Sequence, residues 1–159
     1  MWYKGKMVLS VASYNFLRWH KNARVVTAFL LDFILCYLLT DKAVQFAVER
    51  DTTMQIFEAF IWTFGDSNAI LLVSLLLLIL FADMPFITTA TPFYLMRTTR
   101  RVWVVGQMVY VALATMLFMV FTLFSTVVLT MQNAFTGNRW SRTAAALAYS
   151  GSGKELNLP

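Results

Sequence analysis

Three apolar runs dominate the pattern of hydrophobic and polar positions along the chain. They cover residues 25–40, 69–87 and 102–131, and polar residues gather between them. About 20 consecutive apolar residues cross the hydrocarbon core of a bilayer as a helix. The pattern therefore predicts an all-α integral membrane protein with three transmembrane helices, the third long enough to tilt or to extend beyond the bilayer at one end.

Residues 1–24 carry five basic side chains and no acidic one. At helical spacing one face is apolar, although Leu17 interrupts the polar face opposite. Such a segment is typical of an amphipathic helix that lies in the headgroup region at the membrane surface. A solvated tail with scattered apolar residues is the alternative. The apolar face consists of Val8, Val11, Ala12, Phe16 and Trp19.

The polar segments between the apolar runs differ in character. Within residues 41–68, the short aromatic stretch 54–64 predicts an external interfacial helix, with its phenylalanines in the membrane and Glu58 reaching outward. Residues 88–101 form a short polar loop in which Pro92 favours the first turn of a helix. Residues 132–159 form an external tail, or the start of a continuation beyond this chain.

Basic residues in the short loops predict the orientation of the spans. The N-terminal segment has five and the loop 88–101 has three, whereas residues 41–68 carry two bases against five acids. Cytoplasmic loops are enriched in Lys and Arg. We therefore expect the N-terminus and the loop 88–101 to be cytoplasmic and residues 41–68 and the tail to lie outside, although the tail's own Arg and Lys residues run against this.

Composition supports the membrane class and excludes several others. Hydrophobic residues make up 59% of the chain and charged residues 13%, against about 25% charged in a soluble domain. The net charge of +5 comes without a basic run interleaved with aromatics, which argues against nucleic acid. The single cysteine, Cys36, lies within an apolar run and provides neither a disulfide framework nor a metal cluster. No small-residue cleavage site follows the first run, so we expect a retained span and not a signal peptide.

No arrangement of residues points to catalysis. Residues 151–154, GSGK, lack the preceding glycine and the following Ser or Thr that a phosphate-binding loop needs. His20, the only histidine, has no cysteine or acidic cluster beside it in the sequence. We therefore expect no enzyme activity, no cofactor and no metal site.

Asp32 stands near the middle of the first apolar run. An acid there must face protein or water, because exposing it to lipid is costly. It either belongs to a proton or substrate path or binds the helices together through hydrogen bonds, and the absence of a second ionisable partner favours the structural role. Gln107 and Tyr110 lie at a similar depth in the third run, so we expect Asp32 to bond one of them.

Arg97, Arg100 and Arg101 close the polar loop. Their positive charge alone would hold the loop in the cytoplasm. The planar guanidinium fork also suits fixed contacts to carboxylates better than lysine does. The loop is therefore the predicted site of contact with a partner protein.

A series of short segments carries a resemblance to a known family. In order they read IFEAFI, FADMPF, RTTRRVW, GQMVY and GNRWS, after a basic amphipathic N-terminus. This order resembles the permease subunits of bacterial ABC-2-type transporters. The resemblance implies a separate ABC ATPase subunit, an interfacial helix at residues 7–21 and a coupling segment from Thr91 to Arg101, with Arg97, Arg100 and Arg101 as its contacts.

The chain departs from that family in its number of spans. Such permeases usually have further crossings after the segment that corresponds to GNRWS. The chain is therefore either the N-terminal part of a longer permease or a half-unit that pairs with a second copy. We expect a multi-pass protein of the plasma membrane that couples ATP hydrolysis on its partner to substrate export. The alternative is a small membrane protein without transport activity, such as an assembly scaffold or an immunity-type factor.

Overall fold

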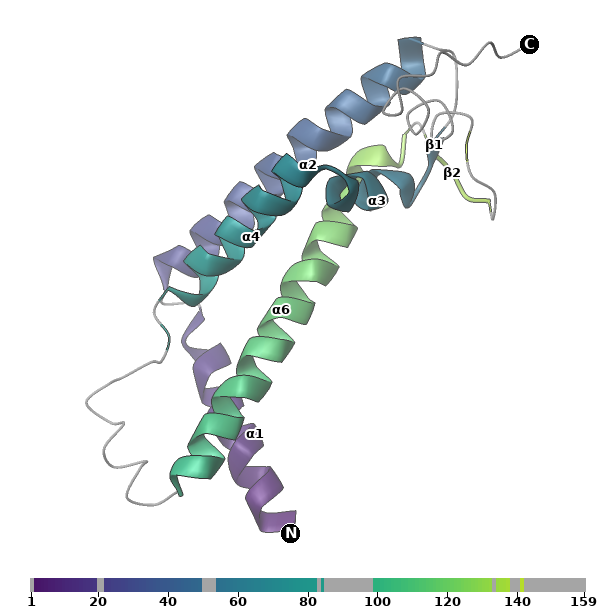
Figure 1. The fold of residues 1–159 in the computed structure, drawn as a ribbon. Helices are drawn as coiled ribbons and strands as arrows, with labels where there is room; N and C mark the ends of the chain where they lie inside the picture. Colours follow the sequence, from purple (N-terminus) through teal and green to yellow (C-terminus); the bar gives the residue numbers. More distant parts are fainter. Residues whose placement is uncertain are drawn as a thin grey trace. The chain divides into compact units, whose positions relative to one another are not determined.

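The described residues of the computed structural model are mostly helical, which confirms the prediction of an all-α protein in its general form (Figure 1). The structure describes residues 2–19, 22–49, 54–82, 84, 99–132, 134–137 and 141. The helices are α1 (Trp2–Leu17), α2 (Ala23–Glu49), α3 (Glu58–Gly65), α4 (Ser67–Phe81) and α6 (Arg100–Thr130). Two short strands, β1 (Met54–Gln55) and β2 (Ala134–Phe135), complete the described elements.

Two of these helices are long and apolar enough to cross a membrane. They are α2, over Ala23–Gln45, and α6, over its full length. The helices α3 and α4 reach the same criterion only together, and they are bent by 88° at the break between them. The described residues therefore contain two candidate spans, or three if the bent pair is counted as one.

Helix α2 continues nine residues beyond the predicted end of the first span at residue 40. Asp41 and Lys42 mark the end of the apolar run but do not stop the helix, because no glycine or proline follows until Gly65. The Gln45 amide donates a hydrogen bond to the Asp41 carboxylate one turn earlier, at 2.9 Å. Charge therefore ends the apolar pattern here, but the helix continues to Glu49.

The break between α3 and α4 has a local cause. Asp66 leaves the helical conformation, with φ −93° and ψ 123°. Its side chain accepts a hydrogen bond of 3.0 Å from the backbone N–H of Asn68. That geometry makes Asp66 the N-cap of α4. The predicted interfacial helix at 54–64 is accordingly found as the strand β1 followed by α3, which turns sharply into α4.

Several predicted features fall at or outside the described residues. Arg100 and Arg101 belong to the first turn of α6 and not to the preceding loop. Arg97, Pro92, His20 and the segment 142–159 with its GSGK sequence lie outside the described residues.

The chain divides into two compact units, and the long helices contribute to both. The first unit comprises Met1–Leu31 and Val73–Val120, and the second comprises Asp32–Leu72 and Phe121–Pro159. The first unit has its buried centre at Ala12, Tyr110 and Ala114. The second is centred on Ala43, Ala47 and Met54, beside the parallel pairing of β1 with β2.

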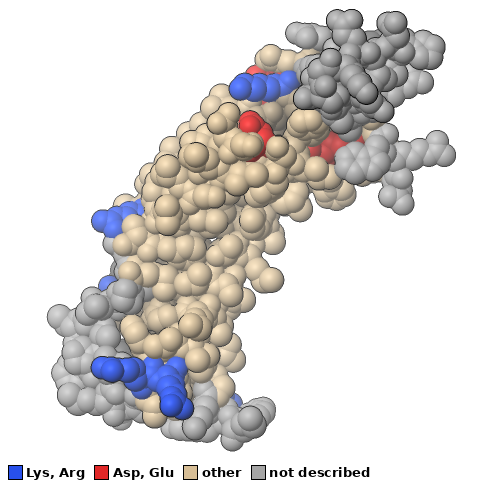
Figure 2. Space-filling model, viewed as in Figure 1, with Lys and Arg blue, Asp and Glu red and all other residues tan. Residues whose placement is uncertain are grey.

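The buried and exposed faces of the long helices are reversed relative to a soluble protein. On α2 the buried positions are mostly small or polar, and they are Val25, Ala28, Asp32, Cys36, Thr40, Ala43 and Ala47. Large apolar side chains of the same helix are exposed, among them Leu30, Phe33 and Leu38. Most of the face drawn in Figure 2 carries neither an acidic nor a basic side chain. Small residues between helices and large apolar residues outside are typical of packing in lipid.

Candidate functional site

Within the first unit, α1 packs closely against the first half of α6. A Cβ atom on Gly106 would lie 2.8 Å from Cβ and Cγ1 of Val11 and 3.3 Å from the backbone oxygen of Val8. Only a glycine allows the two helices to approach this closely. The face of residues 1–24 that the sequence predicts to be apolar thus includes the surface that contacts α6.

Two hydrogen bonds between side chains join the same helices. The buried Asn15 amide donates to Oε1 of Gln107 at 2.9 Å. The Trp19 indole N–H donates to the Tyr110 hydroxyl at 2.7 Å, and Phe16 and Phe81 pack edge-on against the Tyr110 ring. We call this set, together with Val11 and Gly106, the α1–α6 contact. It combines close backbone approach with satisfied polar groups, and so it holds α1 against the first half of α6.

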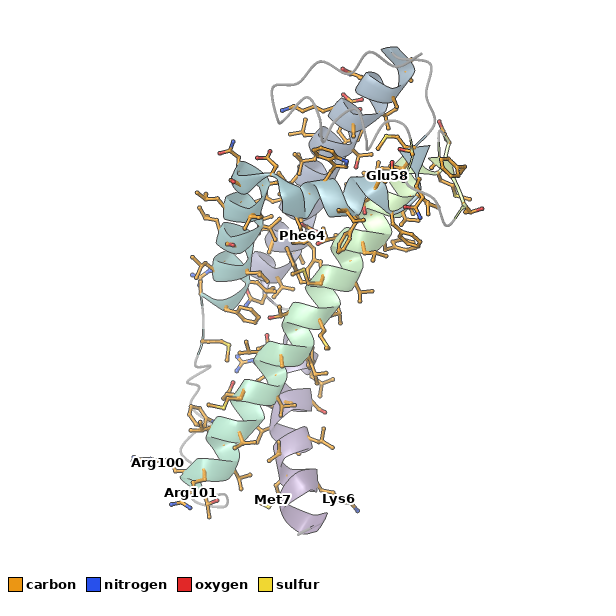
Figure 3. The ribbon with its side chains drawn as sticks, turned by 45° about the vertical axis from the view of Figure 1, so that its right-hand side comes forward. Lys6, Met7, Glu58, Phe64, Arg100 and Arg101 are labelled. Atoms are coloured by element: carbon orange, nitrogen blue, oxygen red, sulfur yellow. The ribbon has the colours of Figure 1, made fainter. Side chains whose placement is uncertain are left out.

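Basic side chains lie at the start of both helices in this contact. Lys6 on α1 and Arg100 and Arg101 on α6 are all exposed. Figure 3 shows them at the same end of the first unit, where α1 and α6 both begin. Two of the three arginines expected to contact a partner are therefore held on the first turn of a long helix, one to two turns before Gln107.

In the second unit, Asp32 is fully buried beside the later part of α6. Its Oδ2 accepts a hydrogen bond of 3.0 Å from the Thr122 hydroxyl. Its other oxygen, Oδ1, has no hydrogen-bond partner among the described residues. Cys36, one turn later on α2, lies 4.0 Å from the backbone oxygen of Thr122 through its Sγ. The acid therefore joins α2 to α6 with one of its two oxygens.

The sequence predicts that Asp32 bonds Gln107 or Tyr110, and this prediction is wrong because Asp32 bonds Thr122. Gln107 bonds Asn15 and Tyr110 bonds Trp19, and both belong to the first unit. Counting depth from Arg24 and Arg101 identified residues on α6 but not the correct ones, because Asp32 meets α6 at Thr122, fifteen positions after Gln107. The structural role expected for Asp32 stays a prediction.

Buried hydroxyl groups continue along α6 from Thr122 to the end of the helix. These residues are at most 2% exposed, and their spacing places them on one helical face. They are Thr122, Ser125, Thr126 and Thr130. The hydroxyls of Thr126 and Thr130 donate to backbone oxygens within α6, and that of Thr130 also lies 3.4 Å from the backbone oxygen of Ile56. We call this row the hydroxyl face of α6.

Glu58, at the start of α3, is fully buried and uses both carboxylate oxygens (Figure 3). Oε1 accepts from the backbone N–H of Ser141 at 2.7 Å, and Oε2 accepts from the Ser141 hydroxyl at 2.5 Å and the Gln55 N–H at 3.1 Å. The expectation that Glu58 reaches outward is wrong, because these three donors compensate its burial. Phe57, which precedes α3 as its N-cap, and Ile61 on α3 have exposed side chains.

No local pattern predicts this contact of residues 54–58 with residues 134–137 and 141. The Gln55 side chain donates to the backbone oxygen of Gly137, and the Ile56 N–H donates to that of Phe135. Two-residue strands are too short to show alternation, and their partners are about eighty positions apart. Glu58 itself was the available clue, because an acid inside an aromatic run needs donors.

No family, no curated protein and no solved structure was found to match this chain. Its function must therefore be argued from its own residues.

Proposed function

We propose that this chain is the membrane subunit of a transporter that couples ATP hydrolysis on a separate ABC ATPase chain to substrate export. The observation that carries the proposal is the α1–α6 contact with its basic end. A partner that binds Lys6, Arg100 and Arg101 would hold the first turns of two helices at once. The resemblance of the sequence to ABC-2-type permeases supports the same assignment.

The direction of the helices supports three crossings of the plasma membrane. In the first unit Trp19 contacts Tyr110 and Phe29 contacts Phe118, so the chain entering α2 runs in the same direction as α6. The chain must then cross back between them, and α4 ends with Phe81 beside Tyr110. Helix α4 has 15 residues, about 22 Å at 1.5 Å per residue, so it needs flanking residues to complete a span of about 30 Å.

The coupling would be mechanical. Closure of an ATPase dimer moves whatever is docked on it, and the docked turns of α1 and α6 are joined by the bonds of Asn15 and Trp19. Helix α6 runs without a break to Thr130, and its hydroxyl face holds Asp32 through Thr122. A displacement at the basic end would thus move α1 and the first half of α6 together.

A transport path requires more helices than the described residues supply. Three helices packed around small buried residues enclose no continuous passage of their own. The subunit would therefore act with a second copy of itself or with further spans. The N-terminus and the basic end would lie in the cytoplasm, by the positive-inside rule.

Two triple variants test the contact with an ATPase. In the first, Arg97, Arg100 and Arg101 are each replaced by alanine, and in the second each is replaced by lysine. The lysine variant keeps the positive charge that sets topology but lacks the guanidinium fork. Tagged chains are purified from native membranes, and co-purified proteins are identified by mass spectrometry.

The wild-type chain is expected to bring down an ABC ATPase, the lysine variant to bring down less, and the alanine variant to lose it while still inserting in the membrane. Undiminished ATPase recovery with both variants would assign the arginines to topology alone. A wild-type chain that recovers no ATPase would favour a scaffold or an immunity-type factor instead.

A further inference from the structure

The two buried acids of the second unit are bonded in opposite ways. Both Asp32 and Glu58 are fully buried. Glu58 accepts three hydrogen bonds through both of its oxygens. Asp32 accepts one, from Thr122, and its Oδ1 has no partner among the described residues. Burying an unpaired charge costs much more than burying an unpaired hydroxyl. The arrangement around Asp32 therefore suits a carboxylic acid better than a carboxylate.

In the described helices α2, α4 and α6, no charged residue lies within two turns of Asp32 or of Thr122. Helix α6 from Val102 to Thr130 carries Tyr110 as its sole titratable residue, and α4 carries none along its length. On α2, the titratable groups within two turns are Cys36 and Tyr37, and the Cys36 thiol approaches the backbone oxygen of Thr122. A proton bound to the unpartnered Oδ1 would neutralise Asp32 without a further group.

We propose that Asp32 is a reversible proton-binding site inside the membrane, served by the hydroxyl face of α6. The proton binds Asp32 as an O–H bond and leaves to water, so that acid and carboxylate interconvert and no other bond changes. Ser125, Thr126 and Thr130 extend the polar face from Thr122 toward the end of α6. In the other direction the next buried position on this face of α6 is Phe118. Exchange therefore runs by way of the Thr130 end.

The site does not depend on an ATPase partner, so it can be tested on the full chain alone in lipid nanodiscs. Infrared difference spectra follow the C=O stretch of protonated carboxyl groups as the pH changes. Asp41 and Asp66 are exposed, whereas Asp32 and Glu58 are buried. Labelling the chain with 13C at the aspartate carboxyl separates Asp32 from Glu58 without any substitution.

The expected result is a protonated-aspartate band at neutral pH that shifts with the label, is missing in Asp32→Asn and disappears reversibly as the pH rises. Two results would overturn the proposal: no such band at any pH, or a band that persists unchanged to the highest pH at which the chain remains helical. The first would make Asp32 a permanent carboxylate, and the second would make it a fixed structural acid.

Two further variants test the geometry. Thr122→Val removes the hydrogen-bond donor that the described residues provide to the Asp32 carboxylate, and it is expected to move the midpoint of the band to higher pH. Thr115→Val makes the same change elsewhere on α6 and is expected to leave the midpoint in place. The double variant Ser125→Ala/Thr126→Val is expected to slow the return of the band after a drop in pH. An unmoved midpoint in Thr122→Val would refute the assigned site, and an unchanged rate in the double variant would refute the route.

Discussion

At the scale of single residues, the contacts that join the helices depend on side chains that are small or polar. Gly106 allows α1 and α6 to meet, and Asn15 and Gln107 satisfy each other beside it. In lipid, no hydrophobic driving force brings apolar side chains of two helices together, because the lipid tails are equally apolar. Close packing and hydrogen bonds must therefore hold the helices together. A single added methyl group at such a point therefore has more effect than the same group on an exposed face.

Gly106→Ala is expected to lower the free energy of unfolding by about 1–2 kcal/mol, because overpacking costs about 1–3 kcal/mol and the gain in helix propensity offsets at most about 1 kcal/mol. The added Cβ would lie 2.8 Å from Cβ of Val11, which no rotation of the valine side chain can move away. Reversible unfolding in mixed detergent, followed by circular dichroism, measures the change.

Gly5→Ala is the matched control for that substitution. Gly5 lies on α1 with nothing within 4 Å of the position of a Cβ. It should be neutral or slightly stabilising, since only the helix propensity changes. In a Val11→Gly background the cost of Gly106→Ala should shrink. An equal cost in both backgrounds would show that Val11 is not the group that Gly106 accommodates.

At the scale of elements, the apolar pattern predicted which segments are helices and missed how they end. Residues 69–87 and 102–131 were predicted as spans, and α4 and α6 occupy most of each. The break at Asp66 depends on the hydrogen bond of a single side chain, which hydrophobicity does not encode. The hydrogen-bond partners of Asp32 and Glu58 lie about 80 to 90 positions away in the sequence, and no local pattern specifies them.

Glu58→Gln is expected to release Ser141 from the second unit. Glu58 now accepts hydrogen bonds from the backbone N–H groups of Ser141 and Gln55 through different oxygens. A glutamine keeps only one acceptor oxygen, so its NH2 group would face one of these two donors. Hydrogen bonds to charged groups contribute about 1.5–3 kcal/mol. We expect amide hydrogen exchange of the peptide containing Ser141 to accelerate about tenfold to a hundredfold, as a loss of that size implies.

Asp41→Asn is the control for this measurement. Asp41 is exposed and its carboxylate accepts from Gln45 on the same helix, so the substitution removes a charge without loosening the contact between α3 and Ser141. Exchange at Ser141 should stay at the wild-type rate. If Glu58→Gln also leaves that rate unchanged, the carboxylate does not hold the segment.

At the scale of the whole molecule, the bent pair of α3 and α4 allows two arrangements: it crosses the membrane, or it dips into the membrane and returns. The two arrangements predict opposite relative directions for α2 and α6. With a crossing, α2 and α6 run in the same direction and the chain ends on the side opposite its N-terminus. With a dip, they run in opposite directions, which conflicts with the order of contacts that residues 19 and 29 make along α6.

Single cysteines in a Cys36→Ala background distinguish the two arrangements. Lys6→Cys, Ser67→Cys, Thr99→Cys and Thr136→Cys are all at exposed positions of the described chain. They are treated in intact cells with a maleimide that cannot cross the membrane. With three crossings, the cysteines at positions 67 and 136 react, and those at 6 and 99 react only after permeabilisation.

The pair at positions 99 and 136 decides the result, because a dip would exchange their sides. Position 99 would then react from outside, and 136 would be protected together with 6. The cysteine at position 6 is the internal control, since it precedes α2 and stays on the same side in either arrangement. A protected position 99 with a reactive position 136 would establish α4 as the returning span and place Arg100 and Arg101 on the cytoplasmic side, where an ATPase could reach them.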